Sequence, residues 1–572
     1  MKINDAIIYF LREYGVKYIY GVSGANIEHI HDSIHRLGQG KLVSVMSKSE
    51  SGAAFMADAH ARVHHTLGVC CATSGGGMLN LLVGIAESYM ESVPVLALVG
   101  QPPTSLEGKG AFQDSSGFER SVKGEQLWES VAKHMVKITK AEDFWPEFLL
   151  ALRVAFAGRP GPVVVLLPRD VYDLEVPEPN PAWIEQLQAD IIATPVCEPA
   201  MVTRVRAALI EAKKPVLIIG QGIRGSPKSD AVIQFAIETG IPVATTLSSR
   251  GDYPNNLQNY LGMIGMAGHP SVHQYIQQEA DLILVAGSGL SVLNRGPLGP
   301  RLDHSKTIFI NIESSSIRHS FPRAQVVEVD VGDFFERLFK QREGLTWPFP
   351  ANYKRQVYKP ILSNLPDHRN WEGSLLQSQA ILALQEILPN HGHLLFDAGN
   401  CAAAAMHYSL VPAHTTSTIA LGMGGMGYSI GGAIGAQLGS DEHARTVVFV
   451  GDGAFLMCGL EIHTAVALKL PILYVVFNNN QHGMCTTRQQ LYFEGRLECV
   501  SYPCVDIAQI ARGLGNSQSI WTGQASSLDE LQDCLRDYRQ HMEVPGVLDL
   551  RISREEVPPF TAFLPPDAEV ID

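Results

Sequence analysis

Two stretches in the last third of the chain decide the fold: TVVFVGDG at residues 446–453 and PILYVVFNNN at residues 471–480. Each begins as a run of aliphatic and aromatic residues that is long enough for a buried strand and short for a helix. The first run ends in a Gly-Asp-Gly turn around Asp452, and the second ends in the asparagines at 478–480. Parallel strands present their C-terminal ends at one edge of a sheet, where such folds bind ligands. The two stretches therefore predict a βαβ unit with a polar site at that edge.

The same alternation of strand-like and helical stretches extends over all 572 residues. We therefore predict an α/β protein of three Rossmann-like domains with parallel sheets: a first block (residues 1–175), a central block (190–345) and a third block (370–560). Prolines mark both junctions, at 176–183 and 346–360, so we expect the central block to begin near Pro195 and the third near Trp371. The expected strands are residues 17–21, 68–72, 93–99 and 163–167 in the first block, 215–220, 241–246, 281–287 and 307–312 in the central block, and 393–399, 446–453, 471–480 and 547–553 in the third.

The composition argues against several classes of protein. With 46% hydrophobic and 18% charged residues the chain is globular, and a net charge of −14 without a run of Lys or Arg argues against nucleic acid as a partner. The start of the chain has the pattern of an amphipathic helix rather than a signal peptide, and the longest apolar runs are too short to cross a membrane. Nine cysteines without a CxxC pair argue against a disulfide framework or a zinc site, and Cys70 and Cys71 are expected to fill a buried strand. We expect a soluble, cytoplasmic protein.

The polar residues at the two strand ends have the chemistry of a metal and phosphate site. Asp452 offers a carboxylate and Asn479 a carboxamide, and a hard cation such as Mg²⁺ prefers these oxygen ligands. Gly451 and Gly453 allow backbone N–H groups to approach a phosphate closely. A Gly-Asp-Gly turn alone would be an ordinary loop, but its spacing from the asparagines and its place after a buried strand favour the site.

This pattern resembles the thiamine diphosphate motif, a GDG sequence followed after about two dozen residues by paired asparagines. With two further motifs, the resemblance covers nearly the whole chain and points to the family of acetolactate synthase, pyruvate oxidase and benzaldehyde lyase. It implies thiamine diphosphate and Mg²⁺ as cofactors, the metal being held by Asp452, the Asn479 side chain and the backbone carbonyl of Gln481. In place of Ala454 the family often has a Ser that contacts the diphosphate, so one hydrogen bond is lost. The other cofactor contacts implied on this side are Gly399, Asn400, Gly451, Gly453, His482, Gly483 and Met484, with Cys401 beside them.

The second motif is SKSESGAAFMADAHARV at residues 47–63. Taken alone, Glu50 is a carboxylate in the first turn of a helix, stabilised by the helix dipole. By resemblance it is the glutamate that hydrogen-bonds N1′ of the aminopyrimidine and favours the tautomer whose 4′-nitrogen removes the C2 proton. A buried carboxyl with a raised pKa suits such a relay. The match continues through TSGGGMLN, which begins at Thr73, a further implied cofactor contact.

The third motif is LGMGGMGYSIGGAIGAQ at residues 421–437. On its own it is typical of a glycine-rich loop followed by a closely packed helix. By resemblance, Met426 is the bulky residue that wedges between the two rings of the cofactor, and Gly424 offers its carbonyl to N4′.

The resemblance also implies a substrate pocket. Gly24 and Ala25 fall at a turn beside the reacting carbon, where small residues leave space for an acceptor carbonyl, and Asn26 follows them. Phe112 and Gln113 match the Phe-Gln pair of acetolactate synthases. A neutral Gln can bind a hydroxyl without protonating the carbanion early, which favours carboligation over simple decarboxylation.

Two departures from acetolactate synthases bear on the substrate. Residues 75–77 are Gly-Gly-Gly in place of Gly-Pro-Gly, which is closer to benzaldehyde lyase. Arg488 stands where acetolactate synthases carry a Trp that shapes the acceptor site. An arginine there would favour an anionic or phosphate-bearing acceptor.

Other conspicuous residues have ordinary explanations. The histidines at 29, 31 and 35 do not share one helix face, and each is more typical of a solvated or satisfied side chain. Lys133 and His134 fall near a lysine used by acetolactate synthases, although a surface position is about as typical. GQGIRG at residues 220–225 is a weak indication of a dinucleotide, and no convincing FAD signature is present.

We therefore predict a thiamine-diphosphate-dependent carboligase, resembling acetolactate synthase, that decarboxylates a 2-oxo acid donor and transfers the acyl carbanion to a second carbonyl compound. A non-oxidative 2-oxo acid decarboxylase or C–C lyase is the first alternative, distinguished by aldehyde release without an acceptor. A non-catalytic nucleotide-binding α/β protein is the alternative from another class, and the joint presence of Glu50, Asp452 and Asn479 argues against it. In the family, Glu50 and Asp452 come from different subunits, so we expect a homodimer or a homotetramer.

Overall fold

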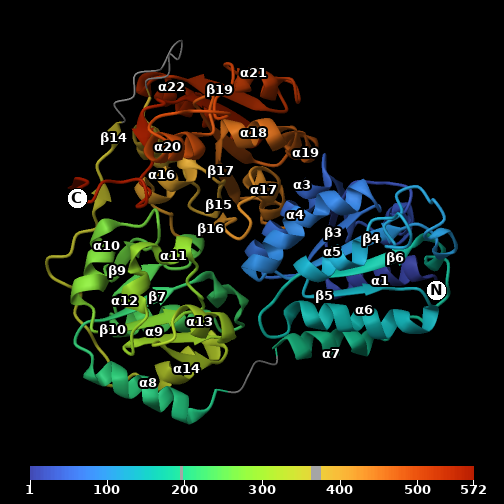
Figure 1. Ribbon diagram of the computed structural model, residues 1–572, viewed down its shortest axis with the longest axis horizontal. Coiled ribbons are helices and arrows are strands. Elements are labelled where there is room, and N and C mark those ends of the chain that lie inside the picture. Colours follow the sequence, from blue (N-terminus) through green and yellow to red (C-terminus); the bar gives the residue numbers. More distant parts are fainter. Residues whose placement is uncertain (193–196, 363–374) are drawn as a thin grey trace. The chain divides into compact units, whose positions relative to one another are not determined.

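The computed structural model describes residues 1–192, 197–362 and 375–572, and its fold is α/β with three six-stranded, all-parallel sheets (Figure 1). The predicted fold class is confirmed. The chain forms two compact units: a first unit of Met1–Ala193, Ala420–Asp441 and Cys458–Leu470, and a second unit of Thr194–Ile419, Glu442–Met457 and Pro471–Asp572. The expected starts of the central and third blocks, near Pro195 and Trp371, lie outside the described residues, and the block boundaries stay predictions.

The first block forms a sheet with the strand order β2-β1-β3-β4-β6-β5. Its strands are β1 (Tyr18–Gly21), β2 (Val43–Met46), β3 (Gly68–Ala72), β4 (Val95–Gln101), β5 (His134–Lys137) and β6 (Val163–Pro168). Its helices are α1 (Ile3–Tyr14), α2 (Glu28–Leu37), α3 (Glu50–His64), α4 (Gly76–Glu91), α5 (Gly124–Val131), α6 (Ala141–Phe156) and α7 (Pro181–Ile192).

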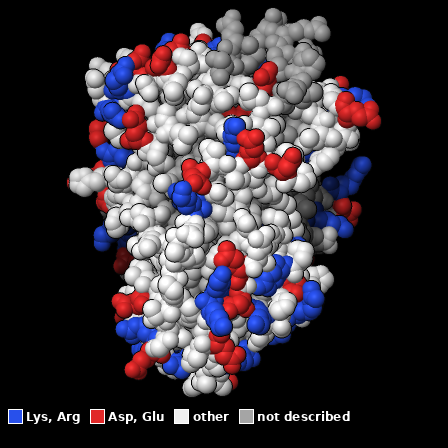
Figure 2. Space-filling model, turned by 90° about the vertical axis from the view of Figure 1, so that its left-hand side faces the viewer, with Lys and Arg blue, Asp and Glu red and all other residues white. Residues whose placement is uncertain are grey.

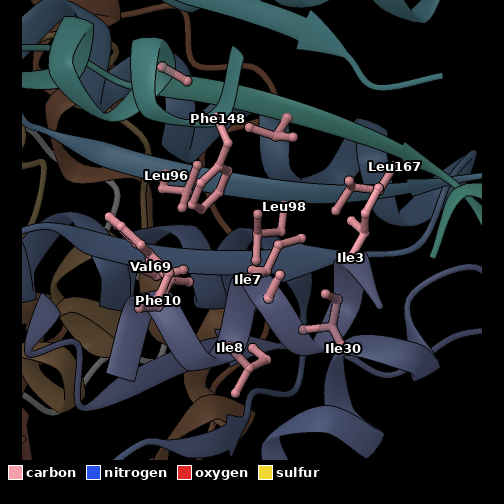
Figure 3. Close-up of a cluster of buried hydrophobic side chains, with 14 of the residues drawn as sticks. Ile3, Ile7, Ile8, Phe10, Ile30, Val69, Leu96, Leu98, Phe148 and Leu167 are labelled. Carbon is pink, nitrogen blue, oxygen red and sulfur yellow. The ribbon is translucent and has the colours of Figure 1, made fainter. Parts of the chain in front are cut away.

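Both faces of this sheet are covered. The amphipathic start of the chain forms α1, as predicted, and its apolar side packs on the sheet together with α2 and α6. The buried side chains labelled in Figure 3 belong to this core: Ile3, Ile7, Ile8, Phe10, Ile30, Val69, Leu96, Leu98, Phe148 and Leu167. Because side chains alternate along a strand, Cys70 and Ala97 point to the opposite face, where α3 and α4 lie against the strands. Cys70 and Cys71 are therefore buried strand residues, as expected.

The central block has the strand order β12-β11-β10-β7-β8-β9, the order of doubly wound dinucleotide-binding folds. Its strands are β7 (Pro215–Ile219), β8 (Val243–Thr245), β9 (Tyr260–Met263), β10 (Leu282–Ala286), β11 (Thr307–Asn311) and β12 (Gln325–Glu328). One face packs on α8 (Pro199–Glu211), α9 (Asp230–Thr239) and α14 (Val331–Lys340), and the other on α10 (Pro270–Gln274), α12 (Gly299–Leu302) and α13 (Ser315–Ser320).

The third block has the order β16-β15-β17-β18-β20-β19, which repeats the topology of the first sheet. Its strands are β15 (Gly392–Phe396), β16 (Thr415–Ile419), β17 (Arg445–Gly451), β18 (Ile472–Asn478), β19 (Trp521–Ala525) and β20 (Gly546–Arg551). Its helices are α15 (Gln377–Leu384), α16 (Asn400–Tyr408), α17 (Tyr428–Gln437), α18 (Asp452–Cys458), α19 (Ile462–Leu468), α20 (Gly483–Tyr492), α21 (Ile507–Arg512) and α22 (Leu528–Tyr538).

The predicted linker at residues 176–183 is shorter than expected. Helix α7 begins at Pro181, because proline is tolerated in the first turn of a helix, where its missing N–H leaves no bond unmade. Among the described residues, no helix is both long and apolar enough to cross a membrane. On the face shown in Figure 2, the basic side chains are interspersed with acidic ones and form no positive stripe.

Candidate functional site

The predicted metal ligands lie at the C-terminal edge of the third sheet, in the second unit. Asp452 directly follows β17, and the neighbouring strand β18 ends at Asn478. Asp452 is 2% exposed, and its carboxylate accepts hydrogen bonds from the backbone N–H groups of Gly453 (3.0 Å) and Asn479 (3.2 Å). Burial raises the pKa of the Asp452 carboxyl to about 6. A cation at this position would compensate for the buried negative charge.

The segment after β18 brings three of the predicted cofactor contacts together. The side-chain oxygen of Asn479 accepts a hydrogen bond from the backbone N–H of Gln481 (3.2 Å). Helix α20 begins at Gly483, where a Cβ atom would lie 2.8 Å from the amide nitrogen of Asn400 and 3.3 Å from that of Asn479. The Oδ1 atom of Asn400 is buried and has no hydrogen-bond partner among the residues that the structure describes. It is an acceptor open to a bound ligand.

Glycines also lie at this C-terminal edge of the third sheet. Gly399 has a φ angle of 133°, which side chains rarely adopt, and it directly precedes α16. A Cβ atom at Gly451 would lie 3.9 Å from the Sγ atom of Cys401, whose thiol pKa is raised by burial. Ala454 is fully buried in the first turn of α18. The backbone is therefore free of side chains where a phosphate would have to approach.

These residues fit a magnesium diphosphate. Over the described ranges, no group of three or more His, Cys, Asp or Glu side chains is placed to hold a metal ion. A metal at Asp452 would depend on one carboxylate, neutral oxygens and the phosphates of the ligand, which is how Mg²⁺ is commonly bound. The buried Asp452 carboxylate and the side-chain oxygen of the adjacent Asn479 are protein ligands of that kind.

Tyr502, which belongs to none of the sequence motifs, lies beside Asp452. Burial and the neighbouring Asp452 carboxylate raise the pKa of the Tyr502 phenol. Its ring packs edge-on against His482, with 5.7 Å between ring centroids. Of the other predicted residues here, Met484 is half-buried at the start of α20 and Arg488 is exposed one turn later.

Glu50 lies in the first unit as the first residue of α3. The hydroxyl of Ser49 caps this helix by accepting from the backbone N–H of Gly52 (3.0 Å). The side-chain amide of Asn80 donates to Glu50 Oε2 (2.9 Å), and a Cβ atom at Gly77 would lie 3.2 Å from Glu50 Oε1. Glu50 is half-buried rather than buried as expected, because it lies at the surface of the unit beside the exposed Asn80.

Several predicted pocket residues gather next to Glu50. Gly77, which neighbours the Glu50 carboxylate, also packs on Thr73, since a Cβ atom there would lie 3.0 Å from Thr73 Cγ2. The Thr73 hydroxyl donates to Gln113 Oε1 (3.4 Å) and accepts from the backbone N–H of Asn26 (3.3 Å). Gly24 packs on the same side chain, because a Cβ atom at Gly24 would lie 2.7 Å from Thr73 Cβ.

Other predicted residues are more open. Ala25 is exposed, and the Phe112 side chain is 80% exposed although it adjoins Gln113 in sequence. Gly424 and Met426 lie in the segment that precedes α17, and Met426 is half-buried. Gly424 has a φ angle of 64°, and a Cβ atom there would meet nothing within 4 Å.

The remaining motifs have structural explanations. The GQGIRG segment forms a short 3₁₀ helix (Gln221–Gly225), and side chains at Gly220 and Gly222 would collide with residues 287–288, so these glycines serve close loop packing. Burial lowers the pKa of Lys133 to about 8, and its ammonium group donates to the carbonyl of Val154 near the end of α6 (2.7 Å). His29 stacks on Tyr172 with 4.9 Å between ring centroids.

Comparisons with known proteins find relatives over nearly the whole chain. Residues 1–119 match the family model described as thiamine pyrophosphate enzyme, N-terminal TPP binding domain, residues 202–338 the central domain and residues 397–550 the C-terminal TPP binding domain. The probable acetolactate synthase large subunit of Methanocaldococcus jannaschii is 28% identical over 98% of this chain and 93% of its own length. The acetolactate synthase large subunit of Haemophilus influenzae is 29% identical over 90% of this chain and 88% of its own length. Isozyme 1 of that large subunit in Escherichia coli is 28% identical over 98% of this chain and 96% of its own length.

Proposed function

Because the chain belongs to the thiamine pyrophosphate enzymes, we propose that it is a thiamine-diphosphate-dependent carboligase that decarboxylates a 2-oxo acid and joins the acyl carbanion to a second carbonyl compound. The observation that carries the proposal is the chemistry around Glu50, where Asn80, Thr73 and Gln113 supply neutral amide and hydroxyl groups. Release of an aldehyde requires a proton donor for the carbanion. The neutral groups around Glu50 would not supply that proton and so favour transfer to an acceptor.

Each of the chain's own residues has a distinct task in this proposal. Thiamine diphosphate, when bound, supplies the nucleophilic carbon and accepts the electron pair released with carbon dioxide. Asp452, the Asn479 side chain and the Gln481 carbonyl would hold Mg²⁺ at the diphosphate. Glu50 shares a proton with the aminopyrimidine nitrogen N1′, and the hydrogen bond from Asn80 fixes the carboxylate that does so.

The direct test is to incubate the protein with thiamine diphosphate, Mg²⁺ and a panel of 2-oxo acids, pyruvate included, and to identify the products by mass spectrometry. A carboligase gives a 2-hydroxy ketone or 2-hydroxy-2-acyl acid. Aldehyde as the main product, unchanged by added acceptors, would support the decarboxylase or lyase alternative instead. Acetolactate from pyruvate alone would place the chain with the relatives that bear that name.

The acceptor is proposed to be anionic, because Arg488 stands exposed on α20, one turn after Met484. Arg488→Gln should raise the KM for a carboxylate- or phosphate-bearing acceptor and leave the KM for the donor unchanged. A neutral aldehyde acceptor serves as the control. If both acceptors respond equally, Arg488 does not select for charge.

We further propose a homodimer or homotetramer in the cytoplasm, with each active site formed by Glu50 of one subunit and Asp452 of another. In support, α4 presents an exposed apolar stripe of Leu79, Val83 and Met90, and the nine cysteines are free thiols, as is usual in a reducing compartment. Mixing inactive Glu50→Gln and Asp452→Ala chains should restore activity at one site of each heterodimer. If the subunits exchange and no activity returns, the shared site is refuted. A fully active monomer in sedimentation would refute the assembly itself.

A further inference from the structure

Two connections in the chain are topologically equivalent, and each leads to a proposed contact with the cofactor rings. In the first block, residues 47–49 join β2 to Glu50 at the start of α3. In the third block, residues 420–427 join β16 to α17 and carry Met426. Both connections, apart from β16 itself, belong to the first unit, where α3 packs closely on α17. A Cβ atom at Gly431 of α17 would lie 3.1 Å from the Gly52 carbonyl oxygen of α3.

A buried carboxylate of the first block holds the connection of the third. Glu87 of α4 is 1% exposed, and its Oε1 and Oε2 atoms accept hydrogen bonds from the backbone N–H groups of Gly422 (3.1 Å) and Met423 (2.6 Å). A Cβ atom at Gly422 would lie 2.5 Å from Met90 Cβ, so the segment is seated directly on α4. The hydrogen bond to Met423 lies three residues before Met426.

The other end of the segment is held by a buried ionic cluster of Arg62, Asp58 and the same Glu87. The Tyr428 hydroxyl donates to Asp58 Oδ1 (2.6 Å), and Asp58 is fully buried on α3, two turns after Glu50. Arg62 joins the two ends, because its guanidinium bonds Asp58 (2.6 Å) and lies 3.4 Å from Glu87 Oε1. Burial opposes the charge on Arg62, but the surrounding carboxylates outweigh it and raise the pKa of its guanidinium.

A buried carboxylate of the third block holds the connection of the first in the same way. Glu461 precedes α19 and is 3% exposed. Both of its oxygens accept from the backbone N–H of Lys48 (3.0 Å), and the Thr464 hydroxyl donates to Oε1 (2.8 Å). A side chain at Gly52 would collide with the Glu461 carboxylate. This contact lies two residues before Glu50.

We propose that Glu87 and Glu461 are reciprocal positioning residues, each fixing the backbone segment that carries the other block's contact with the cofactor rings, Met426 and Glu50 respectively. The proposal rests on the proposed function for the identity of those contacts. A buried carboxylate must keep its N–H donors, so each segment has one favoured position. Misplacement of a catalytic group by about 1 Å can cost as much as about a hundredfold in rate.

The test uses Glu87→Gln and Glu461→Gln in the full-length protein. In each variant one oxygen becomes an NH₂ group, which cannot accept from the backbone. Without cofactor, amide hydrogen exchange should accelerate in residues 420–428 for Glu87→Gln and in residues 47–52 for Glu461→Gln, each in its own segment only. With thiamine diphosphate and Mg²⁺, affinity for the cofactor should stay within a few fold, while exchange of the C2 proton should slow about tenfold or more.

Two further variants keep the proposal falsifiable. Ser33→Ala is the control, because this fully buried hydroxyl of the same unit bonds Asn4 (2.8 Å) and Asp5 (2.6 Å) rather than either segment or the ionic cluster. It should lower the free energy of unfolding and leave exchange of the C2 proton unchanged. Tyr428→Phe removes one hydroxyl and releases the far end of the segment, so it should accelerate amide exchange there if Glu87→Gln does not fold.

The outcomes separate this proposal from the proposed function. Unchanged amide protection of both segments in the Gln variants would overturn the reciprocal positioning. An equal slowing of C2-proton exchange in Ser33→Ala would overturn it as well, because the effect would then be a general loss of stability. If wild-type protein fails to exchange the C2 proton of bound cofactor, the proposed function fails, and the amide exchange still decides whether each carboxylate fixes its segment.

Discussion

The first and third sheets have the same strand order but carry different chemistry at equivalent places. After the third strand of each sheet, the first block has Thr73 and the third block has Asp452; the fourth strands end at Gln101 and Asn478. The first sheet thus has the neutral hydroxyl of Thr73 where the third sheet has the buried carboxylate of Asp452. The carboxylate of the first block is instead at Glu50, after an edge strand. In the proposed function, the same topology serves twice, once to hold a metal and phosphates and once to transfer a proton.

Replacing Asp452 should have the largest effect and tests the binding half of this comparison. We expect Asp452→Ala to weaken Mg²⁺-dependent binding of thiamine diphosphate by about a hundredfold or more, because the only proposed anionic metal ligand is lost. Calorimetric titration measures it. Thr73→Ala, at the equivalent place in the first block, should weaken binding less than about tenfold, as expected for one neutral hydrogen bond. Equal affinity of Asp452→Ala and wild type would remove Asp452 from the site.

Replacing Glu50 tests the proton-handling half. Glu50→Gln should keep the fold and most of the cofactor affinity but slow deuterium exchange at C2 by about a hundredfold or more, because an amide cannot share a proton with N1′. Nuclear magnetic resonance of the bound cofactor follows that exchange. An unchanged exchange rate would take Glu50 out of the mechanism. Together with Asp452→Ala, the variant shows whether binding and proton transfer are divided between the two blocks.

The sheets also show what the sequence could predict. All twelve expected strands are present. In the three six-stranded sheets, the six strands that were not predicted are the two edge strands of each sheet. Two small two-stranded sheets were not predicted either: β13 (Val357–Tyr358) with β22 (Val570–Ile571), and β14 (Ile361–Leu362) with β21 (Glu556–Val557). Inner strands are covered on both faces and therefore have continuous apolar sequences, such as that of β18. An edge strand has fewer neighbours and tolerates polar residues, as in TTSTI of β16 or in β2, where only Val45 is buried. Such runs lack the pattern on which strand prediction depends.

The sequence could predict which candidate residues lie together where these residues directly follow a strand. It could not predict the carboxylates that accept hydrogen bonds from backbone N–H groups. Asp452 and Asn479 were found because strand ends place them, and the structure brings them together. Glu87 and Glu461 were not, because their partners are N–H groups of segments far away in sequence, and any residue type would supply those donors. Tyr502 likewise adjoins Asp452 only through tertiary packing. Such tertiary contacts cannot be predicted from the spacing of residues in the sequence.

Replacing Gly75 should have a smaller effect, on the stability of the first block and on the position of Gln113. Its φ angle is 62°, and a Cβ atom there would lie 2.8 Å from Gln113 Cβ. Gly75→Ala should therefore lower the free energy of unfolding by about 1–3 kcal/mol and displace Gln113. Gly76→Ala is the matched control, because a Cβ atom at Gly76 meets nothing within 4 Å and alanine favours the helix that begins there. Denaturant titration of both variants measures the difference, and equal stabilities would contradict the strain.

The smallest effect concerns the helices that follow the first strand of each sheet, α2 and α16. His407 of α16 is 1% exposed, and burial lowers its pKa to about 3. Its Nε2 atom accepts from the backbone N–H of Tyr358 (2.8 Å), and its Nδ1 atom lies 3.1 Å from the carbonyl oxygen of Ala267, so both nitrogens are engaged in the neutral form. His35, on the equivalent helix α2, is exposed.

A depressed histidine pKa contributes stability that is fully present above the unfolded pKa of about 6.5 and is lost as the pH falls toward the folded value. Between pH 7 and pH 5.5 the unfolded chain takes up a proton at His407 that the folded chain refuses, so the free energy of unfolding should fall by about 1 kcal/mol from this residue. His407→Gln should be less stable than wild type at pH 7 but should lose less stability on acidification. Urea titrations at the two pH values measure both. If His407→Gln and wild type lose equal stability between pH 7 and pH 5.5, the buried neutral histidine does not set the acid response of the third block, and the two helices do not differ in the way their burial requires.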